Sequence, residues 1–344
     1  MKKLHLMGAA TAALLALSGT ASASAIIASG DVMLGVDDFG QLNIGGGAAD
    51  VAGETIVGMR FVDTASGDEY ESTSHGCLCE GWGIAADGVG GDANNNSGGA
   101  SGLSLVNFTS TATTATSVVD LIGSDLRITH EFTPSATASL YKVSVTLENT
   151  GASDIAAVTY RRAMDWDTSP TPFSEFVTIG GTATTTLLDE SSDDGFADTN
   201  IIARPDLLDI GGCGEDVDFT ACGPSDHGAA FDFALGSILA GEAYSFDIFY
   251  GGALGETAAD AALGAVGAEL YSYGWSADDA DQDGFIDGTT DLAPTYIFAF
   301  AGVGGTVVVP PPGGGSAAVP LPAAGWLLIA GMGGLAAASR RKKA

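Results

Sequence analysis

The sequence predicts an all-β chain, a large antiparallel β-sandwich with one short helix, and three observations lead to this prediction. Hydrophobic residues make up 46% of the 344 residues, which is enough to build a sizeable core. The 50 glycines indicate a chain with many turns. Residues 140–148 alternate polar and apolar side chains with a period of two, which is typical of a strand with one buried face.

Further strands are expected where β-branched and aromatic residues recur between turn residues. These segments are residues 126–132, 155–166, 231–235, 244–250 and 296–301. Two threonine-rich tracts, 109–116 and 182–186, also suit β-structure, with O-linked sugar attachment as the alternative reading. Only residues 257–270 favour a helix, because this alanine-rich segment places Leu263, Val266 and Leu270 at helical spacing.

The N-terminus has the pattern of a secretory signal peptide. Lys2 and Lys3 precede an uncharged apolar stretch over residues 6–17, and residues 21–25 then offer two A-x-A cleavage frames. A short membrane anchor is the alternative, but the apolar run is too short to span a bilayer. We therefore expect residues 1–23 to be removed and residues 24–305 to form one β-sandwich body.

The C-terminus has the pattern of a sorting tail. A proline- and glycine-rich linker over residues 306–318 leads to Val319-Pro320-Leu321-Pro322-Ala323, an apolar stretch to residue 338, and a basic end over residues 340–343. As a helix the apolar stretch would be roughly 24 Å long, a marginal transmembrane span against a core of about 30 Å. The basic end would stay in the cytoplasm. We expect residues 319–344 to be clipped, with a permanent anchor as the alternative.

This tail resembles the VPLPA variant of the PEP-CTERM sorting signals of Gram-negative bacteria. The resemblance covers only about the last 26 residues. It implies recognition by an exosortase-type membrane protease, cleavage near the motif, and delivery to the cell surface or the extracellular matrix. It also implies an association with exopolysaccharide and biofilm, and it says nothing about the chemistry of the body.

The charge balance excludes some partners. The chain holds 12 Lys and Arg against 43 Asp and Glu, and six of those basic residues lie at the extreme ends. A body with this excess of acidic residues would repel nucleic acid and anionic lipid. We therefore expect the protein to contact a membrane only through its C-terminal tail. Cations are the natural partners, and nothing in the sequence indicates an organic cofactor.

One acidic segment has the spacing of a calcium loop. Carboxylates stand at positions 1, 3, 5 and 9, a glycine at position 6, and a backbone carbonyl is available at position 7. The residues are Asp279, Asp281, Asp283, Asp287, Gly284 and Phe285. The segment resembles the loops of EF-hand, dockerin and thrombospondin type 3 modules, although position 12 is Thr290 rather than an acid. A solvated acidic turn is the alternative.

Two weaker segments repeat part of this pattern. Glu190, Ser192, Asp194 and Asp198 end in the same Asp-Gly-Phe-x-Asp order, and an empty acidic loop explains them equally well. Residues 92–96 space one Asp and two Asn residues alternately, and there a glycine-rich loop is the better reading.

The four cysteines are even in number, which suits disulfides in an oxidising compartment. Cys213 and Cys222 enclose a short acidic loop and are expected to pair. Cys77 and Cys79 stand so close that a direct bond constrains the backbone, and cross-links to the other pair are the alternative. The order His75, Cys77, Cys79, Glu80 also offers zinc or copper ligands, but we favour disulfides.

A carbohydrate-active site is the alternative to a non-catalytic role. On a strand Asp165 and Asp167 would share a face roughly 6–7 Å apart, a glycosidase spacing, with Glu175 nearby. Trp166 would point to the opposite face, however. Arg161 would lie on the aspartate face and Arg162 on the other, and we expect local ion pairs to explain much of the pattern.

Signatures of other enzymes are missing from the sequence. It contains no G-x-S-x-G, H-E-x-x-H or P-loop motif, and its histidines are scattered. The sequence thus favours a non-catalytic, calcium-stabilised surface or matrix protein. A secreted carbohydrate-active enzyme or a carbohydrate-binding module is the alternative.

Overall fold

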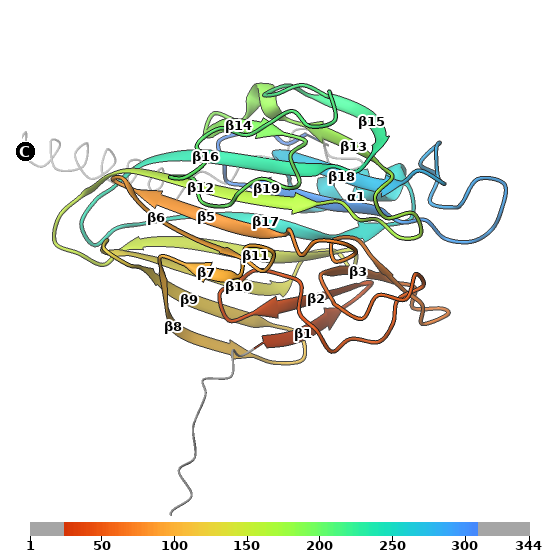
Figure 1. Ribbon diagram of the computed structural model, residues 1–344, viewed down its shortest axis with the longest axis horizontal. Helices are drawn as coiled ribbons and strands as arrows, with labels where there is room; N and C mark the ends of the chain where they lie inside the picture. Colours follow the sequence, from red (N-terminus) through yellow and green to blue (C-terminus); the bar gives the residue numbers. More distant parts are fainter. Residues whose placement is uncertain (1–23, 309–344) are drawn as a thin grey trace, which may run out of the picture. The chain divides into compact units, whose positions relative to one another are not determined.

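The computed structural model describes residues 24–308, and within them the chain forms three antiparallel β-sheets and one α-helix (Figure 1). The predicted all-β character with one short helix is confirmed. The signal peptide (1–23), most of the linker and the sorting tail (319–344) lie outside the described residues. Within the described residues, no helix is long and apolar enough to cross a membrane.

The largest sheet has nine strands, and β11 (Leu140–Asn149), the segment with the clearest alternation, lies beside the central strand. β11 pairs with β10 on one side and β17 on the other, and its side chains alternate between buried and half-buried. The order is β15 (Phe219–Ser225), β13 (Glu175–Gly180), β18 (Leu270–Ser276), β19 (Thr295–Ala301), β17 (Ala243–Ala253), β11 (Leu140–Asn149), β10 (Leu126–Pro134), β9 (Ala115–Leu121) and β8 (Leu103–Ser110).

Two smaller sheets complete the fold. The six-stranded sheet has the order β14 (Leu188–Ser192), β16 (Gly228–Ile238), β12 (Ile155–Asp165), β5 (Gly81–Ala86), β6 (Val89–Asn94) and β7 (Gly99–Ser101). The four-stranded sheet runs through β1 (Ser24–Ser29), β2 (Val32–Asp37), β3 (Met59–Val62) and β4 (Glu69–Glu71).

The six-stranded and nine-stranded sheets pack face to face through aromatic side chains. Phe231 of β16 lies 5.5 Å, ring centre to ring centre, from Phe298 of β19 and 5.3 Å from Phe300. Tyr160 of β12 lies 5.1 Å from Phe246 of β17. Such edge-to-face pairs add to the free energy gained by burying the rings, so this layer is the main core of the protein.

The chain crosses between these two sheets at two neighbouring places. Residues 166–174 carry it from β12 to β13, and residues 226–227 carry it from β15 to β16. The crossings are adjacent because Asp165 pairs with Gly228 in one sheet and Glu175 pairs with Ser225 in the other. Acidic residues that lie far apart in the sequence therefore gather at this edge.

Some element boundaries differ from those predicted. Helix α1 spans Glu256–Val266 and ends before residue 270, because Gly267 adopts a left-handed conformation (φ 67°) and its N–H caps Leu263 O. Residues 182–186 begin with the 3₁₀ helix η1 (Thr182–Thr184) rather than a strand. There the N–H and hydroxyl of Thr182 both donate to Asp218 Oδ1 at 2.8 Å, which competes with sheet pairing. The tract 109–116 covers the turn between β8 and β9.

Candidate functional site

Three carboxylates of the predicted calcium loop converge in the structure. Oxygen atoms of Asp279, Asp281 and Asp287 lie within 4.8 Å of one another. Asp279 is buried, and its two oxygens accept the N–H groups of Asp283 and Gly284, each at 3.0 Å. These bonds wrap the chain around Asp279, while Asp281 and Asp287 face solvent. The group could hold a metal ion.

The glycine of this loop is required by its backbone. Gly284 has φ 96°, and a Cβ at this position would stand 2.7 Å from the backbone nitrogen of Gly255. Asp283 is not part of this group of oxygens, and its Oδ1 accepts the N–H of Phe285 at 3.0 Å. Burial raises the pKa of Asp279 to about 6, against the two backbone hydrogen bonds that lower it. A cation would favour its ionised form.

The second acidic segment is organised differently. Glu190 Oε2 accepts the N–H of Leu207 at 2.9 Å, and Asp198 accepts that of Asn200 at 2.9 Å. Ser192 Oγ accepts the N–H of Asp194 at 3.1 Å. Glu190 thus reaches a segment 17 residues away, whereas Ser192 and Asp198 close local turns. Among the described residues, these side chains do not gather into a group of metal ligands.

Residues 92–96 are partly strand. Asp92 and Asn94 lie in β6 and pair with both neighbouring strands, so the expected glycine-rich loop begins only after them. Asn94 Oδ1 then accepts the N–H groups of Asn96 and Ser97. The amide therefore closes a turn at the end of the strand.

The cysteines form two disulfides, Cys213–Cys222 as predicted and Cys77–Cys79 directly. The Cα atoms of Cys77 and Cys79 are 5.2 Å apart, within the range that a disulfide bridges, so the alternative of cross-links to the other pair is not formed. With both sulfurs oxidised, these cysteines offer no thiolate to zinc or copper. The binding motif suggested around His75 is therefore absent in this state.

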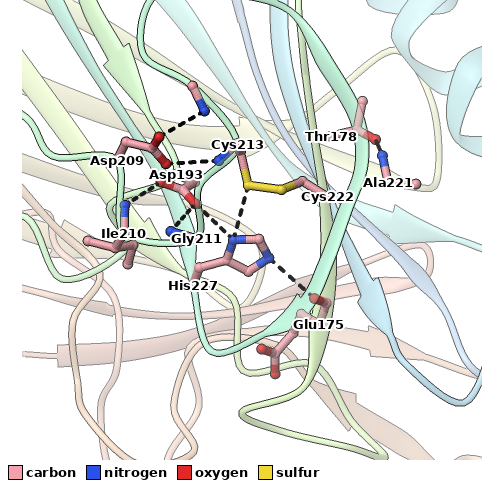
Figure 2. Close-up of a disulfide and its surroundings, with 11 residues drawn as sticks. Glu175, Thr178, Asp193, Asp209, Ile210, Gly211, Cys213, Ala221, Cys222 and His227 are labelled. Carbon is pink, nitrogen blue, oxygen red and sulfur yellow. Dashed lines mark hydrogen bonds and ion pairs between the residues drawn. A yellow bond between two sulfur atoms is a disulfide. The ribbon is translucent and has the colours of Figure 1, made fainter.

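The Cys213–Cys222 disulfide lies beside a buried ion pair (Figure 2). His227 Nε2 donates to the carbonyl of Glu175 at 3.2 Å, and Nδ1 lies 3.1 Å from Asp193 Oδ2. Asp193 also accepts the N–H groups of Ile210 and Gly211, and hydrogen bonds lower its pKa despite its burial. The side chain of His227 therefore bridges Asp193 and the backbone of β13. This pair ties the disulfide loop to β13.

The structure also brings His75, Asp50 and Ser169 together, which no local pattern in the sequence indicates. Ser169 Oγ donates to Asp50 Oδ2 at 2.6 Å, and His75 Nε2 lies 3.0 Å from Ser169 Oγ and 3.2 Å from Asp50 Oδ2. In a hydrolytic triad the serine and the acid contact different nitrogens of the histidine. Here one nitrogen faces both, so this cluster does not have the geometry to activate the serine.

The arginines of β12 do not pair with the neighbouring aspartates. Arg161 makes a two-pronged bond to Asp232, with both distances 2.6 Å, and Arg162 Nε donates to Glu80 at 2.6 Å. The expected local ion pairs with Asp165 and Asp167 are therefore replaced by pairs across the sheet. The reason is register: Asp232 stands directly opposite Arg161 on β16.

The three acids considered for catalysis are all buried. Asp165 and Asp167 are 1% and 0% exposed, and Glu175 is 0% exposed. Burial and then the charges of neighbouring carboxylates raise the pKa of Asp165 and Asp167, and burial raises the pKa of Glu175 to about 9. Asp226, an exposed residue that the sequence did not single out, comes within 4.8 Å of both aspartates.

Trp166 is part of the core. It is fully buried, and its indole N–H donates to Ser272 Oγ at 3.1 Å. A Cβ at Gly274 would stand 2.4 Å from this ring, so the strand passes directly over it. The indole face is therefore covered by protein and is not presented to solvent.

A surface pocket of about 480 Å³ lies elsewhere, beside the calcium-loop segment. Asp63, Asp68 and Asp291 line it together with Tyr70 and Pro170. No protein-family model and no curated protein sequence matches this chain.

Proposed function

We propose that the mature protein is a non-catalytic, calcium-stabilised β-sandwich of the cell surface or extracellular matrix. The observation that carries the proposal is the convergence of Asp279, Asp281 and Asp287 on a loop that Asp279 itself folds. Carboxylate oxygens alone are the donor set that a hard cation such as Ca²⁺ prefers. A cation would also relieve the repulsion among three negative charges held within 4.8 Å.

Two features support an extracellular location. Both cysteine pairs are oxidised, which suits an exported protein. The sorting tail, Val319 to Ala323 with its apolar stretch and basic end, supports processing by an exosortase-type protease. We propose exopolysaccharide or biofilm matrix as the setting, with the signal peptide and the transmembrane helix acting only during export.

The burial of the candidate catalytic acids supports a non-catalytic role. A glycosidase must place two carboxylates on either side of a bound sugar. Asp165 and Asp167 are almost completely buried, and Trp166 between them packs against β18. Substrate would have no access to these groups without a rearrangement of the core.

Thermal unfolding of the full-length chain, with calcium and with a chelator, tests the calcium proposal. Calcium at 100 times its Kd should add about 2.7 kcal/mol, which corresponds to several degrees in Tm. A variant with Asp281→Asn and Asp287→Asn, named the loop variant, should lose the part of this response that comes from the loop. Asp283→Asn is the matched control and should keep most of it, because Asp283 is outside the group of oxygens that lie within 4.8 Å of one another.

Sodium chloride at matched ionic strength separates coordination from screening. It should reproduce only part of the stabilisation by calcium. If it stabilises the wild-type chain as much as millimolar calcium does, the loop is an acidic turn and the proposal is wrong.

Carbohydrate binding is a second candidate, favoured by the surface pocket. Its carboxylates can accept hydrogen bonds from sugar hydroxyls, and Tyr70 and Pro170 add apolar surface. A glycan array should then show binding that Asp63→Asn with Asp291→Asn removes. Polysaccharide turnover that Asp165→Asn abolishes would instead support an enzyme.

A further inference from the structure

The two crossings between the sheets bring together three carboxylates outside the calcium loop. Asp165 ends β12, Asp167 follows it, and Asp226 lies between β15 and β16. Oxygens of the three lie within 4.8 Å of one another. Asp165 and Asp167 are buried whereas Asp226 is exposed, so the cluster reaches solvent on one side. An ion could enter from there.

The two buried carboxylates lack hydrogen-bond donors. Asp167 is 0% exposed, and within residues 24–308 neither of its oxygens has a hydrogen-bond partner. Asp165 Oδ1 has none either. Asp165 Oδ2 lies 3.2 Å from Sγ of Cys77, but this sulfur is bonded to Cys79 and carries no hydrogen to donate. Buried carboxylates are otherwise almost always satisfied, so these oxygens indicate a missing ligand.

The surroundings of the cluster are negative. The charges that act on Asp167 come from Asp165, Glu175, Asp226 and Glu71, and all of them disfavour its ionised form. The two arginines of β12 are held by other carboxylates, as described above. A ligand for this place must therefore be a cation.

We propose that Asp165, Asp167 and Asp226 bind a divalent cation of the hard, oxygen-seeking class to which Ca²⁺ belongs, at a site separate from the Asp279–Asp287 loop. The donors are all carboxylate oxygens, which select such ions over zinc or copper. The ion links the crossing from β12 to β13 with the crossing from β15 to β16, and so holds the edges of the two sheets together. This inference extends the calcium-stabilised function proposed above but rests on different atoms.

Counting bound calcium by equilibrium dialysis of the full-length chain tests the proposal. The wild-type chain should bind two ions and the loop variant one. A cluster variant, Asp165→Asn with Asp167→Asn, should also bind one ion, and the loop and cluster variants combined should bind none. Glu131→Gln with Glu148→Gln removes two exposed charges from β10 and β11 and should leave two ions bound. These counts separate failure of this site from failure of the loop.

Terbium luminescence excited through tryptophan locates the remaining ion. Trp166 lies between Asp165 and Asp167 in the chain, so it can pass its excitation to a terbium ion bound at the cluster. The loop variant should therefore keep the sensitised emission, and the combined variant should lose it. If the cluster variant does not fold, Asp226→Asn at the exposed ligand serves instead and should weaken one of the two sites at least tenfold. Two ions bound to the cluster variant, or none bound to the loop variant, would overturn the proposal.

Discussion

Gly195 lies against Asp165 so closely that a Cβ at position 195 would stand 2.7 Å from Oδ1 of the carboxylate. The same Cβ would be 2.9 Å from Cα of Gly228, the residue paired with Asp165 on β16. The segment after β14 therefore closes the cluster from a third side, and only a residue without a side chain fits there.

Substitution of Gly195 by alanine should displace Asp165 and weaken cation binding at the cluster. Overpacking of this kind costs about 1–3 kcal/mol in unfolding free energy. Displacing one ligand should lower calcium affinity about tenfold, equivalent to about 1.4 kcal/mol. Calcium titration of Gly195→Ala in the loop variant measures this. Gly45→Ala is the control, since a Cβ there meets nothing within 4 Å. Equal affinity in both would show that Asp165 is not a ligand.

The convergence of Asp279, Asp281 and Asp287 was predictable because all three lie within one short segment. The spacing of Asp279, Asp281 and Asp287 and the glycine at position 284 carry the information locally. The position of Asp283 was not predictable, since its turn toward Phe285 depends on the local backbone. The strands with period-two alternation, such as β11, could be predicted for the same local reason.

The buried cluster was only half predictable. Asp165 and Asp167 stand out in the sequence, but Asp226 reaches them through the register of β12 with β16. The partners of the arginines depend on that register as well, and no local pattern specifies it. The direct Cys77–Cys79 bond likewise follows from a backbone turn that composition does not reveal.

Removing Arg162 should strongly destabilise the protein. Its partner Glu80 is fully buried and also accepts the N–H of Leu42 at 2.6 Å and the hydroxyl of Tyr250 at 3.2 Å. Arg162→Met leaves an uncompensated buried charge, which costs about 3–5 kcal/mol. Urea unfolding measures the loss, and Arg162→Met with Glu80→Gln should recover a part of it. A double variant no more stable than the single one would contradict this.

Sorting should leave a mature chain without either end. Intact-mass measurement of extracellular material should show loss of residues up to about 23 or 25 and loss of the tail near Pro322, because we expect the signal peptide and the sorting motif to be cut there. Substitution of Pro320 and Pro322 by alanine should block only the second cut. Full-length chain that keeps the basic end at residues 340–343 in washed membranes would mean a permanent anchor.

His130 is a buried histidine that should make the fold sensitive to acid. Its ring lies 4.6 Å from that of Trp82, centre to centre, and its Nε2 contacts the hydroxyl of Tyr160 at 3.0 Å. Burial, together with the charge of Arg162, lowers its pKa well below 6.5. The folded chain therefore holds this imidazole neutral at a pH where the unfolded chain protonates it.

The stability contributed by neutral His130 should be complete above pH 6.5 and lost as the pH falls below it. The unfolded state then binds one more proton than the folded state, which costs up to about 1.4 kcal/mol per pH unit. His130→Phe should lower the overall free energy of unfolding but flatten its slope between about pH 5 and 6.5, as measured by urea unfolding. Phe132→Leu on the same strand is the control and should keep the wild-type slope. Parallel curves for wild type and His130→Phe would mean that His130 takes up its proton in the folded state.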